Sequence, residues 1–126
     1  MGTDATNEET IRRFCSAFAR RDVDELCAFF TPDAVYHNIP MAPAEGIDAI
    51  RGSLEMFVPV SPYVEFEILN MASDGGLVFT ERVDRMEFGG KAVELTVTGV
   101  FEVEGEHVKA WRDYFDMQMF FGSGGS

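Results

Sequence analysis

Arg82, Asp84 and Asp113 are the residues of this chain whose types and spacing could do chemistry. In the segment ERVDRMEF, Arg82 and Asp84 are two residues apart, so on a strand they project from the same face. In VKAWRDYFDM, Asp113 shares a strand face with Trp111 and Phe115, where a charged group needs a partner. An arginine between two carboxylates can keep one ionised while the other holds a proton. The three residues therefore suggest paired acid and base catalysis.

The same three residues also allow a simpler interpretation, in which Arg82 neutralises a buried carboxylate and only locks the sheet. Two acids around one arginine suggest a chemical role in addition to this structural one. Their mutual repulsion raises the pKa of one acid, whereas the arginine and hydrogen bonds lower the pKa of the other. A proton donor and a proton acceptor then lie close together at neutral pH, as acid–base catalysis requires.

Tyr36 and Asn38 form a second candidate group. They stand two residues apart in AVYHNIP, so an extended segment turns the hydroxyl and the carboxamide to the same side. Together with one carboxylate they could hold a water molecule by three hydrogen bonds. His37 faces the other way in this alternation and is interpreted as a surface or interface residue.

Helices are expected in the first half of the chain. Thr6 with Glu9 predicts a capping box, so a first helix should begin near Thr6 or Asn7 and bury one apolar face. Asp22 should begin a second short helix, and a third is predicted over residues 47–57, after Gly46.

The rest of the chain is expected to be β-structure. An extended segment is predicted at residues 34–41, followed by strands at 64–72, 76–88, 91–104 and 107–120, with glycine-rich turns between them. Helices followed by long strands predict an α+β fold, in which a curved mixed, mainly antiparallel sheet wraps around the N-terminal helices. Such a cone leaves room for an apolar pocket at its wide end. Arg82, Asp84 and Asp113 should point toward it.

Composition sets limits on partners and setting. We expect one domain over residues 1–121, with the GSGGS at 122–126 being a linker or tag remnant. The net charge of −12 argues against nucleic acid and anionic membrane surfaces. The N-terminus does not resemble a secretory signal, and a cytoplasmic setting is expected. Cys15 and Cys27 fall on apolar helix stripes and are expected to be buried free thiols, too few for a zinc site. No metal and no cofactor are expected.

The motifs YHNIP, ERVDRMEF and WRDYFD, in this order, resemble those of the limonene-1,2-epoxide hydrolases. That family has the nuclear-transport-factor-2-like (NTF2-like) or SnoaL-like fold, which ketosteroid isomerases and polyketide cyclases share. The stretch from Ala17 to Asn38 is generic to the fold. The RVD triplet combined with WRDYFD is the specific part.

The resemblance implies a role for each candidate residue. Asp113 matches the base that deprotonates a water, and Tyr36 and Asn38 match the residues that position it. Asp84 matches the acid that protonates the epoxide oxygen, and Arg82 matches the bridge between the two carboxylates. The family opens the epoxide in one step, without a covalent ester and without a metal, and many members are homodimers.

The expected substrate is a small hydrophobic cyclic or aryl epoxide, which would react with water to give a vicinal diol. Seven apolar residues are predicted to line its pocket, although each one alone is more readily interpreted as plain core: Phe18, Phe57, Met86, Leu95, Val97, Phe115 and Phe120. Two alternatives stay open. One is an isomerase or cyclase on the same fold, which would need an oxyanion hole and a single carboxylate base. The other is a non-catalytic module that binds small molecules.

Overall fold

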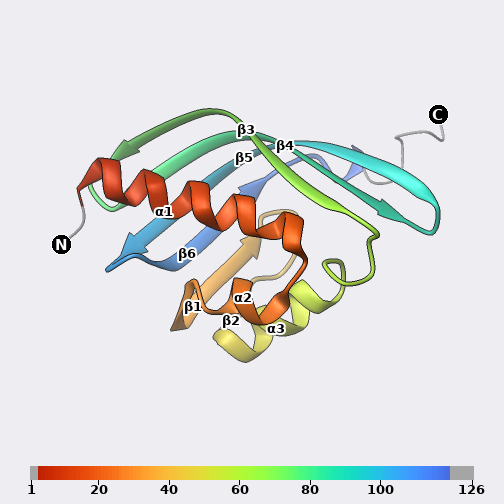
Figure 1. Ribbon diagram of the computed structural model, residues 1–126, viewed down its shortest axis with the longest axis horizontal. Helices are drawn as coiled ribbons and strands as arrows, with labels where there is room; N and C mark the ends of the chain where they lie inside the picture. Colours follow the sequence, from red (N-terminus) through yellow and green to blue (C-terminus); the bar gives the residue numbers. More distant parts are fainter. Residues whose placement is uncertain (1–2, 120–126) are drawn as a thin grey trace.

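The computed structural model describes residues 3–119 as one curved sheet with helices on its concave side (Figure 1). The helical elements are α1 (Asp4–Ala17), the 3₁₀ turn η1 (Phe18–Arg20), α2 (Val23–Cys27) and α3 (Ile47–Glu55). The strands are β1 (Phe30–Asn38), β2 (Ala44–Glu45), β3 (Val64–Asp74), β4 (Leu77–Phe88), β5 (Lys91–Glu104) and β6 (His107–Tyr114). The predicted order, helices before a long β-meander, is confirmed.

The six strands form a single mixed sheet in the order β2-β1-β6-β5-β4-β3. Strands β3 to β6 pair with one another in antiparallel fashion, as glycine-turn hairpins require. Strand β1 lies parallel to β6 and places Tyr36 beside Trp111 and Asn38 beside Asp113. This parallel pair joins the first half of the chain to its end. The curved, mainly antiparallel α+β architecture is therefore as the sequence predicts.

The first helix begins earlier than predicted. Thr3 is the N-cap, and its hydroxyl accepts a hydrogen bond from the backbone N–H of Thr6. The Thr6 hydroxyl in turn accepts one from the Thr3 backbone N–H at 2.7 Å. The expected capping box of Thr6 with Glu9 is thus wrong, because Thr3 and Thr6 already form one a turn earlier. The second helix is capped as expected, since the Asp22 carboxylate accepts from the Glu25 N–H.

The last strand is shorter than predicted. Strand β6 ends at Tyr114, and Phe115 follows in an irregular segment. The pairing of β6 with β5 has an irregularity in the register between Glu102 and Val103. The predicted pocket residue Phe120 lies outside the described residues.

An aromatic cluster fills the space between α1 and the sheet. Phe14 is fully buried and meets five other rings at centroid distances of 5.1 to 6.1 Å, those of Phe18, Phe29, Phe30, Phe101 and Trp111. Aromatic rings supply much apolar area each, so this cluster fixes α1 against the concave face. Cys15 and Cys27 are buried free thiols, as predicted. Among the described residues, no helix is long and apolar enough to cross a lipid bilayer.

Replacing Phe14 with alanine should destabilise the fold by about 4 kcal/mol, because it leaves a cavity among these rings. Urea unfolding followed by circular dichroism measures the loss. Val60→Ala is the control: Val60 is 63% exposed, and its truncation should change the unfolding free energy by less than about 0.5 kcal/mol. Equal, small losses in both variants would contradict the assigned core.

Candidate active site

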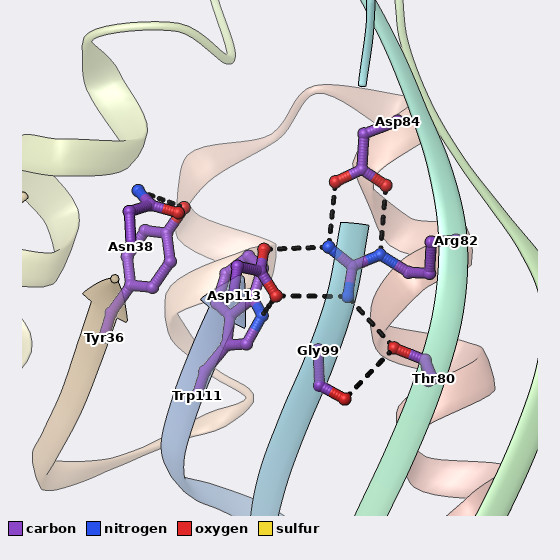
Figure 2. A network of polar contacts seen from close by, with 8 residues as sticks. All are labelled: Tyr36, Asn38, Thr80, Arg82, Asp84, Gly99, Trp111 and Asp113. Carbon is purple, nitrogen blue, oxygen red and sulfur yellow. Dashed lines mark hydrogen bonds and ion pairs between the residues drawn. The ribbon is translucent and has the colours of Figure 1, made fainter. Parts of the chain in front are cut away.

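Arg82 is the centre of a buried polar network (Figure 2). Its Nε and Nη2 donate to the two oxygens of Asp84, at 3.0 and 2.8 Å. Its Nη1 and Nη2 donate to the two oxygens of Asp113, at 3.2 and 2.8 Å. The remaining donor of Nη1 contacts the Thr80 hydroxyl at 3.1 Å. All five N–H groups of a guanidinium are thereby used, and two carboxylates that are distant in the sequence are joined through one cation.

Burial sets the electrostatics of this triad. Arg82 is fully buried, and Asp84 and Asp113 are each only 3% exposed. Two ionised carboxylates and one guanidinium would leave a net negative charge away from water, which is costly. Burial accordingly raises the pKa of Asp84 to about 6, although Arg82 opposes the shift, and the charge of Asp113 adds to it. Burial alone would lower the pKa of Arg82, but the two carboxylates outweigh it and raise that pKa. Asp84 can therefore be protonated at a pH near 6, whereas Arg82 keeps its own proton and stays positively charged.

Asp113 is fixed from a second direction by Trp111. The indole Nε1 donates to Asp113 Oδ1 at 2.6 Å, from two positions back on the same strand face. The Tyr36 ring stacks on the indole with centroids 4.1 Å apart and planes at 10°. Arg82 also lies over the rings of Phe66 and Phe101, at 5.0 and 5.8 Å. Aromatic packing thus holds both charged partners in one orientation.

Tyr36 and Asn38 lie beside this carboxylate, as the parallel register of β1 and β6 requires. The Asn38 amide donates to the Tyr36 hydroxyl at 3.1 Å. Burial, and next the charge of Asp113, raise the pKa of Tyr36 above its ordinary value, so the hydroxyl keeps its proton. A protonated hydroxyl, an amide and a carboxylate therefore border the same cavity (Figure 2).

The cavity has a volume of about 370 Å³. Four of the five predicted catalytic residues line it, namely Tyr36, Asn38, Asp84 and Asp113, with Arg82 buried behind the carboxylates. Of the predicted pocket residues, the structure places five on its wall: Phe57, Met86, Leu95, Val97 and Phe115. Phe18 is not among them, because it is fully buried and stacks on Phe66 with centroids 4.1 Å apart.

Sequence reasoning missed several lining residues. Phe66 and Phe88 lie on strands and share the inward alternation, so that pattern could have identified them. Met41, Ala42 and Ala44 follow Pro40 in a segment without periodicity, and Ser53 and Met56 lie on or just after α3. No local pattern distinguishes these from ordinary surface residues. Within residues 3–119, no group of three or more His, Cys, Asp or Glu side chains is arranged to hold a metal ion.

Comparison with known proteins decides the family. The model of the limonene-1,2-epoxide hydrolase catalytic domain matches residues 5–124. Epoxide hydrolase EphG of Mycobacterium tuberculosis is 33% identical over 116 residues, which cover 88% of this chain and 74% of that protein. The chain belongs to the limonene-1,2-epoxide hydrolase family.

Solved structures agree with this family. A structure of a limonene-epoxide-hydrolase-like enzyme from M. tuberculosis has a TM-score of 0.79 at 30% identity, covering 94% of this chain and 89% of the other. A hypothetical protein from Catenulispora acidiphila with a ketosteroid isomerase-like fold has a TM-score of 0.84 at 18% identity, covering 93% and 92%. The second likeness shows the fold alone. The NTF2-like fold that the sequence predicts is thereby confirmed, and with it the epoxide hydrolase family.

The raised pKa of Asp84 makes the stability of this family member depend on pH. The pKa rises from 3.8 to about 6 on folding, so the folded protein binds this proton more tightly than the unfolded chain. The stabilisation is complete below about pH 4 and is lost as the pH rises through about 6. It amounts to about 3 kcal/mol, at about 1.4 kcal/mol for each unit of pKa.

Asp84→Asn removes this titrating carboxyl group. The unfolding free energy of the wild type minus that of the variant should therefore fall by about 3 kcal/mol between pH 4 and pH 7. Urea titrations of both proteins across this range measure the difference, and the carboxylates outside the Arg82 network cancel in the comparison. Parallel pH profiles for the two proteins would contradict the raised pKa.

Proposed function

We propose that this protein is an epoxide hydrolase that adds an activated water to a hydrophobic cyclic or aryl epoxide and releases a vicinal diol. The observation that carries the proposal is the buried pair of Asp84 and Asp113 around Arg82, with both carboxylates reaching one apolar cavity. An epoxide needs a positioned nucleophile on one side and a proton for the departing oxygen on the other. A pair of carboxyl groups in different protonation states supplies both.

Asp113 is the proposed general base. Its Oδ1 receives hydrogen bonds from Trp111 and Arg82, whereas within residues 3–119 Oδ2 receives only the bond from Arg82. Oδ2 is therefore the oxygen better able to accept a proton from water. The Tyr36 hydroxyl can donate to that water and Asn38 can bond it from the same side. Such positioning avoids a loss of entropy in the barrier.

Asp84 is the proposed general acid. Its raised pKa, about 6, leaves part of the Asp84 population protonated near neutral pH, and its carboxyl group borders the cavity. As the ring opens, negative charge develops on the epoxide oxygen, and Asp84 transfers its proton there. Asp113 receives a proton from water in the same step. The buried cluster therefore keeps its net charge, because Asp84 loses one proton to the epoxide oxygen while Asp113 gains another from water, with Arg82 bonded to both.

A one-step reaction fits Asp113 better than a covalent ester does. An attacking carboxylate would have to move toward the substrate carbon. Arg82 holds both oxygens of Asp113, and Trp111 holds one of them. Water can approach the carbon without disturbing these bonds.

The wall of the cavity supports a hydrophobic, uncharged substrate. Phe57, Phe66, Leu95 and Val97 offer apolar contacts, and the polar lining side chains are those of Tyr36, Asn38, Ser53, Asp84 and Asp113. Such a site binds an apolar ring and orients one polar atom. We propose in addition a homodimer, from the family resemblance, and a cytoplasmic setting.

Incubation with cyclohexene oxide, with diol measured by chiral chromatography, tests the proposed activity. Asp113→Asn and Asp84→Asn should each lower kcat by about 10²- to 10⁴-fold, because each removes one partner of the proton transfer. Asp116→Asn is the matched control: Asp116 is exposed, lies outside the cavity wall, and its variant should keep wild-type rates. Near-full activity in either site variant would refute the acid–base assignment. No diol from cyclohexene, limonene and styrene oxides would favour an isomerase or a binding module instead.

A single turnover in ¹⁸O-labelled water, with enzyme in excess over epoxide, separates the two mechanisms. Direct attack by water should place one labelled oxygen in the diol of the first turnover. An ester intermediate would instead deliver an unlabelled oxygen from Asp113 and leave the label on the carboxylate. Mass spectrometry of the diol measures the result, and an unlabelled first product contradicts the one-step reaction.

A further inference from the structure

The residues of the triad come from two strands, and a third strand lies between these two. Arg82 is on β4 and Asp113 is on β6, whereas β5 runs between them. Neighbouring strands lie about 4.8 Å apart, so β6 lies about 10 Å from β4, and the Arg82 side chain must cross the concave face of β5 to reach the Asp113 carboxylate. A side chain of β5 at the crossing point would therefore occupy the space that the Arg82 guanidinium needs.

The crossing point is Gly99. Its register partners are Thr80 on β4 and Asp113 on β6, which are both members of the network. The other inward positions around it on β5, Leu95, Val97 and Phe101, carry large buried side chains. Gly99 is the position on this face of β5 where the network meets bare backbone (Figure 2).

The reason for glycine here is space and not backbone conformation. Gly99 lies outside the left-handed region that favours glycine, in contrast to the turn residues Gly75, Gly89, Gly90 and Gly105. A glycine inside a strand weakens it, so its presence needs another cause. A Cβ at position 99 would stand 2.3 Å from Arg82 Nη1, 2.7 Å from Asp113 Oδ1 and 3.0 Å from Thr80 Oγ1. Because Gly99 has no Cβ, the space beside it is free for the ion pair of Arg82 with Asp113.

We propose that Gly99 is a positioning residue of the active site, whose missing side chain lets Arg82 join Asp84 to Asp113. Its catalytic consequence rests on the proposed epoxide hydrolysis, whereas its geometry does not. An alanine methyl would push the guanidinium and Asp113 Oδ1 apart. It would also disturb the bond of Oδ1 with the indole of Trp111, which is 2.6 Å long.

The first test compares Gly99→Ala with Gly52→Ala. A Cβ at the exposed Gly52 of α3 would meet no atom within 4 Å, so it is the matched control. Trp111 is the only tryptophan of the chain, so its indole N–H gives a single ¹H–¹⁵N resonance that reports on Asp113. Gly99→Ala should shift this resonance and lower kcat/KM by about 100-fold or more, because small misplacements of reacting groups are costly. Gly52→Ala should change neither. An unchanged resonance with wild-type kcat/KM in Gly99→Ala overturns the proposal.

The second test is a double-mutant cycle with Arg82→Lys, which keeps the positive charge and removes Nη1, the atom nearest to the added methyl. Gly99→Ala should lower the unfolding free energy much less in the Arg82→Lys protein than in the wild type. Equal losses in both backgrounds overturn the proposal, because the methyl would then not conflict with the guanidinium. Should Gly99→Ala alone fail to fold, recovery of folding in the double variant supports the proposal and failure there overturns it.

The two tests separate this proposal from the proposed reaction. If the wild type forms no diol from any epoxide, the function fails, while the Trp111 resonance and the stability cycle still decide on Gly99. If the wild type forms diol and Gly99→Ala does so equally well with an unmoved resonance, the function stands and the role of Gly99 fails.

Discussion

The structure depends on one buried cation that two carboxylates share. Arg82 donates all five of its N–H groups to Asp84, Asp113 and Thr80, in a place where water does not compensate for charge. A guanidinium there requires the carboxylates, and two carboxylates around one cation favour holding a proton. The same condition that makes the network stable therefore produces an acid and a base at one end of the cavity. Structural locking and the proposed catalysis, which appear as alternatives in the sequence, would be two consequences of one arrangement.

The rest of the fold serves to place this network. Strands β4, β5 and β6 bring its members into register, and β1, parallel to β6, adds Tyr36 and Asn38. The aromatic cluster around Phe14 and Trp111 closes the space behind the carboxylates. On the other side, apolar residues from the strands and from the turn after α3 surround the cavity. A few polar groups are thus set in a mostly apolar wall, which suits the proposed substrate with a single reactive oxygen.

Much of this arrangement could be predicted from local patterns. Alternation in ERVDRMEF placed Arg82 and Asp84 on the inward face, and glycine turns marked the hairpins correctly. The pattern failed where a contact depends on distant parts of the chain. Phe18 has the inward spacing of a pocket residue, but Phe66 on β3 covers it. The N-cap was assigned a turn late, because Thr3 and Thr6 compete with Thr6 and Glu9 for the same role. Gly99 carries a local signal, a glycine among large inward residues, but its meaning appears only when three strands are in register.

The protonation of Asp84 tests the central claim most directly. In protein labelled with ¹³C at the aspartate carboxyl groups, the Asp84 resonance is identified by its loss in Asp84→Asn and followed through a pH titration. We predict a midpoint near the raised pKa of about 6, so that a proton is available beside Arg82 at the start of the reaction. A midpoint at the ordinary aspartate value of about 3.9 would contradict the account, because the site would then contain no acid to protonate the opening epoxide.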